Sequence, residues 1–225
     1  MNIAPLCIIQ ARLNSTRLPR KMLLELDGET LIARAVRLAG LIFYPQHVIV
    51  AIPIADADGA LAGELERLNA NVFAYDGSDW DVLARYWHAA TRYRWHPDAI
   101  IHRWTPDDPF KDAQHVRKVL DGERCPVEQG GEAFTLQMLT RSHQRTSPDD
   151  QAMREHIGNH PMLFPAPAPP ASAGCWTIDT QGDLDAARAR LPKRDNCCLN
   201  CTERCECVRN QPQISPFDNE SWRPC

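Results

Sequence analysis

A cationic loop directly after an apolar run is the part of the sequence best suited to chemistry. The apolar run at residues 6–9 leads into Gln10, and the segment that follows combines four cations with two hydroxyls: Arg12, Arg17, Arg20, Lys21, Ser15 and Thr16. Ligands of open α/β sheets bind to loops that leave the carboxyl ends of strands. Because arginine and lysine make charge-assisted contacts with phosphate oxygens, this loop suits a polyphosphate.

Apolar patterning up to about residue 120 predicts the elements that must position this loop. Short apolar runs predict strands at 6–10, 47–52, 71–75 and 99–103. Helical spacing is found at 31–42 and 58–68, after a capping-box pattern formed by Ser78 and Asp81, and after Asp112. This alternation predicts an α/β fold, with a mostly parallel sheet sandwiched by helices.

The second half is less regular. Helices are expected at 132–139 and 149–157, and five prolines between 161 and 170 exclude regular helix or central strand there. Strand character returns at 175–178, and Thr180 with Asp183 has capping-box spacing into a helix that ends near Leu191. We therefore expect one globular domain over residues 1–192 and a separate Cys-rich tail over 193–225.

Five sequence blocks carry a family resemblance. The first is Gln10-Ala11-Arg12-x-x-Ser15-Thr16-Arg17-Leu18-Pro19-x-Lys21, and the others lie at 77–86, 103–112, 155–156 and 177–184. In this order the blocks resemble those of the cytidylyltransferases that activate acidic sugars, in particular the spore-coat polysaccharide branch. The chain departs from that pattern at Arg20 and Pro106, where the family has Gly, and at Asp108, where it has Cys.

The resemblance implies a nucleotide-diphosphosugar transferase fold and the transfer of CMP from CTP to an acidic or nonulosonate-type sugar, with release of pyrophosphate. It assigns catalysis to Arg12, Lys21 and Asp107, and acceptor binding to Glu155 and His156, with a structural role as the alternative for His156. It assigns nucleotide binding to Ala11, Arg12, Ser15, Thr16, Arg17, Lys21, Ser78 and Arg85. Arg103 follows an apolar strand and precedes an acidic loop, so we expect it to bind the substrate through a carboxylate or phosphate.

The resemblance also implies a magnesium ion held by Asp107 and Asp179. Magnesium takes hard oxygen ligands, usually one or two carboxylates together with phosphate oxygens and water. Simpler roles compete at several positions, because an isolated aspartate often caps a loop or helix. Asp81 and Asp183 fit such capping, and Arg85 could pair with Asp81 on a helix surface instead of reaching a nucleotide.

Composition limits the classes of partner. The 225-residue chain has a formal net charge of −4, and no polybasic run is present, so neither nucleic acid nor a membrane surface is an expected partner. No leader pattern or long apolar stretch is seen, which favours a cytoplasmic protein. CTP and a sugar are the expected partners, and a homodimer is compatible with the resemblance.

Two other functions remain open from the sequence. A glycosyltransferase of the same fold would use a nucleotide-sugar, although the several loop cations suit a triphosphate better than a diphosphate. A non-catalytic metal-binding or interaction protein on a decayed transferase fold would account for Arg20, Pro106 and the tail. Nucleotide binding with and without magnesium separates the non-catalytic alternative from the two enzymes.

Six of the nine cysteines lie in the tail. In a chain without a secretory signal, such clustering favours metal binding over a disulfide framework. Cys198, Cys201, Cys205 and Cys207 offer four thiolates for zinc or an iron-sulfur cluster, although their intervals are tighter than those of ordinary zinc fingers. Disulfides and free thiols are the alternatives.

We predict that the tail binds a thiolate-preferring metal and is dispensable for nucleotide binding, because every transferase block lies before residue 192. A chain cut after Leu191 should keep its affinity for CTP and lose the metal. Elemental analysis of anaerobically purified full-length and truncated protein, paired with CTP titration, checks both parts. Absence of zinc and iron from the full-length chain, or loss of CTP binding on truncation, would contradict them.

Overall fold

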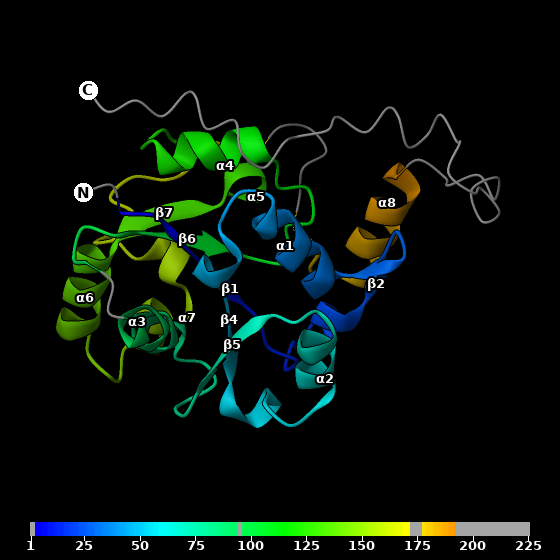
Figure 1. Ribbon diagram of the computed structural model, residues 1–225, viewed down its shortest axis with the longest axis horizontal. Helices are drawn as coiled ribbons and strands as arrows, with labels where there is room; N and C mark the ends of the chain where they lie inside the picture. Colours follow the sequence, from blue (N-terminus) through cyan, green and yellow to red (C-terminus); the bar gives the residue numbers. More distant parts are fainter. Residues whose placement is uncertain (1–2, 94–95, 172–176, 192–225) are drawn as a thin grey trace.

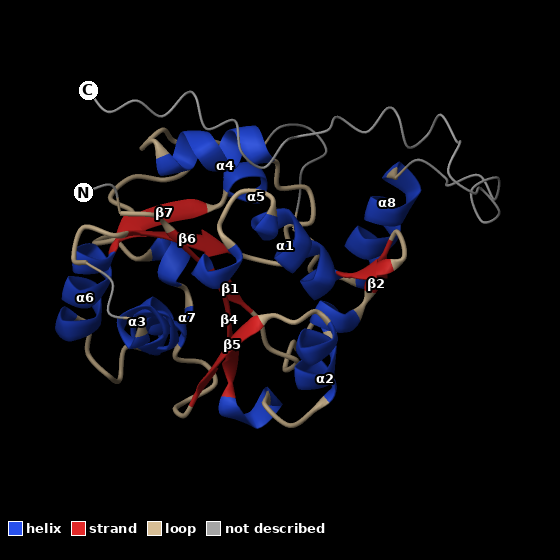
Figure 2. Cartoon of the chain, viewed as in Figure 1, coloured by secondary structure: helices blue, strands red, loops and turns tan. Residues whose placement is uncertain are grey.

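A five-stranded sheet forms the centre of the computed structural model, which describes residues 3–93, 96–171 and 177–191. The strands are β1 (Leu6–Gln10), β4 (Val48–Pro53), β5 (Asn71–Tyr75), β6 (Ile100–Trp104) and β7 (Glu132–Thr135). Their order is β5-β4-β1-β6-β7, and only β7 within this sheet runs antiparallel to its neighbour (Figures 1 and 2). The α/β fold with a mostly parallel sheet is thus confirmed.

Helices cover both faces of the sheet, because successive residues of a strand point to opposite sides. Leu6 and Ile8 belong to one core cluster, which includes side chains of α3 (Val82–Arg92) and α6 (Leu136–Arg145). Cys7 and Ile9 belong to the cluster on the other face, which includes side chains of α1 (Leu31–Gly40), α2 (Ala60–Arg67) and α4 (Ala113–Leu120).

The strand order of the sheet reverses beside β1. The chain runs from β1 to β4 and β5 on one side, and then crosses to β6 on the other side of β1. The carboxyl ends of β1 and β6 therefore lie at a point where the strand order reverses, which is where open α/β sheets bind ligands. The cationic loop leaves β1 at this point, and the loop containing Asp107 leaves β6.

A smaller unit lies beside the main sheet. Strands β2 (Glu25–Leu26) and β3 (Glu29–Thr30) form an antiparallel hairpin, with Asp27 and Gly28 at positive φ in its two-residue turn. Helix α8 (Gln181–Arg190) packs on it through a cluster that includes Leu26, Leu184 and Ala187. The predicted capping box of Thr180 and Asp183 is present at the start of α8.

The structure corrects three local predictions. The expected helix at 132–139 is strand β7 followed by α6, because residues 132–135 pair with the edge of β6. The expected helix at 149–157 is the short α7 (Gln151–Glu155) followed by a 3-10 turn at Ile157–Asn159. Asp81, whose side chain accepts from the Ala84 amide, caps α3 in place of Ser78.

Two predictions concern segments that lie partly or wholly outside the described residues. The expected strand at 175–178 is covered at Thr177 and Ile178, which are not in a strand, and its first half lies outside the described residues. The tail, including Cys198, Cys201, Cys205 and Cys207, also lies outside them. Within the described ranges, no helix has the length and apolar character needed to cross a membrane.

A buried ion pair joins the second half of the chain to α3. Arg154 on α7 donates from Nε and Nη2 to Asp81 Oδ2, at 2.9 and 2.7 Å. The two side chains are only 5% and 12% exposed. Asp81 thus caps α3 with one carboxylate oxygen and holds α7 with the other, and this contact, not one with Arg85, is the ion pair that Asp81 makes.

We predict that Arg154→Met lowers the free energy of unfolding by about 3–5 kcal/mol, because it leaves the Asp81 charge buried without its partner. Arg67→Ala is the matched control: it breaks an ion pair with Glu64 in which the Arg67 side chain is 64% exposed, and it should leave the free energy of unfolding nearly unchanged. Chemical denaturation of both variants measures the difference. Equal destabilisation by the two substitutions would mean that Arg154 does not hold α7 in place.

Candidate active site

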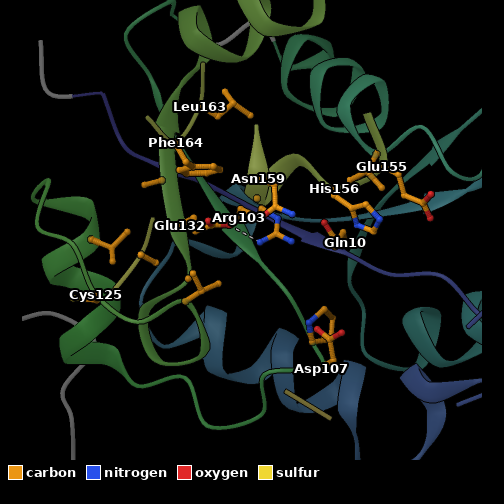
Figure 3. A pocket seen from close by; sticks show the side chains of 18 of the residues that line it. Gln10, Arg103, Asp107, Cys125, Glu132, Glu155, His156, Asn159, Leu163 and Phe164 are labelled. Atoms are coloured by element: carbon orange, nitrogen blue, oxygen red, sulfur yellow. Dashed lines mark hydrogen bonds and ion pairs between the residues drawn. The ribbon is translucent and has the colours of Figure 1, made fainter. Parts of the chain in front are cut away.

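One cavity of about 950 Å³ lies at the carboxyl ends of β1 and β6 (Figure 3). Its volume is within the range of small-molecule sites. The predicted residues that line the cavity are Ala11, Arg12, Ser15, Thr16, Arg17, Lys21, Arg85, Arg103, Asp107, Glu155, His156 and Asp179. Ser78 is exposed and is not among the lining residues.

Lys21 brings both predicted magnesium ligands together. Its ammonium donates to Asp107 Oδ2 at 2.7 Å and to Asp179 Oδ1 at 3.1 Å. The other oxygen of Asp179 pairs with Arg17 Nη1 at 3.0 Å. The Lys21 side chain is 8% exposed, whereas the two carboxylates are 23% and 30% exposed. Three segments far apart in the sequence therefore meet at a single ammonium group.

Asp108 holds the segment that carries Asp179. Its Oδ1 accepts from the Thr177 hydroxyl at 2.6 Å, while its Oδ2 accepts from Thr105 and from Lys111 Nζ. The backbone amide of Ile178 donates to the carbonyl of Asp107 at 2.8 Å. These contacts attach the segment before α8 to the loop after β6, so Asp179 faces Asp107.

The charge of Asp108 is stabilised within the protein. Burial alone would raise its pKa, but the charge of Lys111 and hydrogen bonds from Lys111, Thr105 and Thr177 outweigh burial and lower the pKa. The Lys111 side chain is fully buried. A buried cation therefore neutralises the carboxylate at this position of the third sequence block.

Two arginines support the start of the cationic loop differently. Arg12 pairs with Glu155 on α7, with Nη2 and Oε1 3.2 Å apart. Arg85, which is 1% exposed, donates to the carbonyl oxygens of Ala11 and Asp79. Burial lowers the pKa of Arg85. Arg85 therefore fixes the backbone at Ala11, while the Arg12 side chain is held beside Glu155.

An ion pair between neighbouring strands also lines the cavity. Arg103 on β6 lies opposite Glu132 on β7, and its Nη1 donates to Glu132 Oε2 at 2.5 Å. Burial would lower the pKa of Arg103, but the charge of Glu132 more than compensates and raises it. Arg103 Nε has no hydrogen-bond partner among the described residues. Cross-strand pairing thus places a carboxylate beside the predicted acceptor-binding arginine.

Several lining residues are not evident from the sequence. The segment that contains Glu132 is predicted to be helical, so the cross-strand pairing of Glu132 with Arg103 could not be predicted. Gln10 belongs to the first sequence block, and that membership was the available signal. The other lining residues that were missed lie outside the predicted strands and helices and include Pro106, Arg124, Cys125, Asn159, Leu163 and Phe164.

The carboxylates fit a magnesium ion by their chemistry. Asp107 and Asp179 converge on one cation, Lys21, and both line the cavity. Among the described residues, no cluster of three or more His, Cys, Asp or Glu side chains could hold a metal. Two carboxylates suffice for magnesium when phosphate oxygens and water complete the shell. The arrangement therefore suits a metal that arrives with a polyphosphate.

Comparisons with known proteins agree with this geometry. A family model described as Cytidylyltransferase matches residues 6–144. The chain is 29% identical to the spore coat polysaccharide biosynthesis protein SpsF of Bacillus subtilis over 213 residues, which cover 84% of this chain and 86% of that protein. It is 50% identical over 65 residues to a 3-deoxy-manno-octulosonate cytidylyltransferase of Chlorobium limicola, covering 29% of this chain and 25% of that protein.

Solved structures share the fold. A cytidylyltransferase from Leptospira borgpetersenii serovar Hardjo-bovis superposes with a TM-score of 0.69 at 23% identity, covering 84% of this chain and 86% of that chain. The central sheet and its flanking helices therefore form a nucleotidyltransferase fold.

We predict that Asp108→Asn lowers the free energy of unfolding at pH 7 by about 3–5 kcal/mol, because Lys111 loses its buried counter-charge. The pKa of Asp108 is lower in the folded state, so its contribution is present above the unfolded-state value of about 3.9 and is lost as pH falls through the folded pKa. The free energy of unfolding of the variant should therefore fall less steeply than that of the parent chain as the pH is lowered.

Asp185→Asn is the control, because Asp185 is 61% exposed on α8. Denaturation at a series of pH values compares the two variants with the parent chain. An Asp108→Asn protein with unchanged stability at pH 7 and an unchanged acid limb would refute the structural role of Asp108.

Proposed function

We propose that this chain, which belongs to the cytidylyltransferase family and is a nucleotidyltransferase, transfers CMP from CTP to a hydroxyl group of an acidic or nonulosonate-type sugar. The observation that carries the proposal is the convergence of Arg17 and Lys21 with Asp107 and Asp179 at one end of the cavity. This end combines phosphate-binding cations with two metal-binding carboxylates.

The reaction needs charge neutralisation and alignment more than a protein nucleophile. The sugar oxygen forms a bond to the α-phosphorus, the bond from that phosphorus to the bridging oxygen breaks, and pyrophosphate leaves with the bonding electrons. The sugar hydroxyl loses its proton in the same overall reaction. Arg12, Arg17 and Lys21 would hold the triphosphate oxygens and stabilise the charge that develops on the leaving group.

Asp107 and Asp179 would hold a magnesium ion, which when bound neutralises phosphate charge and aligns the triphosphate. Lys21 contacts both carboxylates in the described state. Its ammonium would turn from the carboxylates to phosphate oxygens when metal and nucleotide bind, because all of these groups lie at the same end of the cavity. Arg85 would keep the loop backbone in place during this exchange.

The acceptor would lie on the Arg103 side of the cavity. Arg103 keeps an unpartnered Nε among the described groups, although Glu132 compensates its charge. Glu155 and His156 line the same cavity and would contact sugar hydroxyls. The relative from Chlorobium limicola, whose name specifies a sugar acid, supports an acidic acceptor.

A panel assay tests the proposed function. Purified full-length protein is incubated with magnesium, each of the four nucleoside triphosphates in turn, and a set of sugar acids, and pyrophosphate is measured. CTP together with at least one sugar acid should release pyrophosphate well above the other nucleotides. Release that does not depend on a sugar, or that does not favour CTP, would contradict the proposed function.

We predict that Arg17→Ala weakens CTP binding by about 1.5–3 kcal/mol, because a charge-assisted contact to the triphosphate is lost. Arg20→Gly is the matched control. It also removes a loop cation, but Arg20 is exposed, is not among the lining residues, and has a left-handed backbone with φ 54° that glycine adopts readily. Calorimetric titration with CTP and magnesium should show a loss for Arg17→Ala alone, and equal losses would exclude specific binding by Arg17.

A further inference from the structure

The β2–β3 hairpin contacts both segments that carry the predicted magnesium ligands. The described residues 25–30, which form this hairpin, do not themselves line the cavity. Leu26 of the hairpin belongs to a hydrophobic cluster that also contains Ile178, directly before Asp179, and against which Phe110 packs, three residues after Asp107. Figure 1 shows α8, the helix that follows Asp179, beside β2. A unit outside the cavity therefore joins the two carboxylate-bearing segments.

Arg34 on α1 attaches the hairpin to the segment after β6. Its Nε donates to the carbonyl of Pro109 at 2.8 Å, and its Nη1 pairs with Glu29 Oε1 at 2.9 Å. The Arg34 side chain is only 14% exposed. One guanidinium thus connects a carboxylate of β3 to a backbone oxygen two residues after Asp107.

The segment around Asp107 is stiff. Pro106 and Pro109 enclose Asp107 and Asp108, and each proline ring fixes its own φ. The amide of Asp108 also donates to the carbonyl of Thr105 at 3.2 Å, which closes a tight turn. Because little backbone freedom remains between the two prolines, a shift of the Pro109 carbonyl would also move the Asp107 carboxylate.

The hairpin holds the Asp179 segment through α8. Arg188 donates from Nε and Nη2 to the carbonyl of Glu25 on β2, at 3.1 and 2.8 Å. Helix α8 begins at Gln181, two residues after Asp179. Leu184 of α8 packs in the same cluster as Leu26. The position of Asp179 therefore depends on the hairpin from one side, as that of Asp107 does from the other.

Arg37 provides a natural comparison with Arg34. It lies on the same helix and pairs with the same carboxylate, with Nε 3.0 Å from Glu29 Oε2 and Nη2 2.5 Å from Glu29 Oε1. Its side chain is 50% exposed, and its hydrogen bonds in the described part of the chain do not include Pro109. The two arginines therefore differ in the contact with the segment that carries Asp107.

We propose that the β2–β3 hairpin, acting through Glu29 and Arg34, is a positioning element that sets the separation of the Asp107 and Asp179 carboxylates and thereby the affinity for a divalent cation. The inference rests on the proposed function, in which these carboxylates hold magnesium. Groups that orient metal ligands from outside the coordination shell tune metal affinity strongly. Neither Glu29 nor Arg34 lines the cavity, so their loss should change metal affinity and leave nucleotide affinity without metal unchanged.

Manganese is the probe, because carboxylate sites for magnesium also accept manganese and electron paramagnetic resonance measures the free hydrated ion. Full-length protein is loaded with α,β-methylene CTP, which cannot release pyrophosphate, and titrated with manganese chloride. Arg34→Met should raise the manganese Kd about tenfold. The Kd of the analogue without metal should stay that of the parent chain, and Arg37→Met should change neither constant.

Arg34→Lys decides the question if Arg34→Met does not fold. Its single ammonium keeps a charge for Glu29 but cannot reproduce the fork that contacts Glu29 and Pro109 together, so it should cause an intermediate loss of manganese affinity. Three results would overturn the positioning role: the parent's manganese Kd in Arg34→Lys, an equal loss in Arg37→Met, or a parent chain that binds no manganese with the analogue. Failure of the proposed function is recognised separately, as manganese binding by the parent chain without CTP-dependent pyrophosphate release with any sugar acid.

Discussion

The contact of the Lys21 ammonium with two carboxylates organises the site, because it joins the loop after β1, the loop after β6 and the segment before α8. Burying an ammonium is costly unless opposite charge surrounds it, so Lys21 requires both aspartates nearby. Those aspartates in turn depend on Asp108 and Lys111, which fix the segment that carries Asp179. The main sheet supplies the remaining constraint by ending β1 and β6 side by side.

Charge pairing continues across the cavity. Arg12 faces Glu155, Arg17 faces Asp179, and Arg103 faces Glu132. Carboxylates of the protein therefore neutralise these three arginines of the cavity. The net charge of the chain is −4, although the loop after β1 is strongly cationic. A polyphosphate with its metal would exchange one set of ionic contacts for another within the same framework.

Local patterns predicted much of the fold because strand and helix periods differ and the sheet buries both faces. The strands at 6–10 and 71–75 were placed within their observed bounds, and the capping box at Thr180 was present. The edge strand at Glu132–Thr135 was not predicted, because its strand state depends on pairing with β6, a contact distant in sequence. The cationic loop was identified by its residue types. The places of Glu132 and of residues 163–168 in the cavity could be found only from the tertiary structure, since nothing in the local sequence relates them to Arg103.

Arg124 holds residues 163–168, a segment that lines the cavity, through the carbonyl oxygens of Ala166 and Pro167. Every amino acid carries such an oxygen. The anchor therefore does not depend on the identity of the residues it holds. Side chains of this segment can change while the attachment persists, and the sheet and the cationic loop need not adjust. A cavity wall held in this way can vary in sequence independently of the opposite end of the cavity.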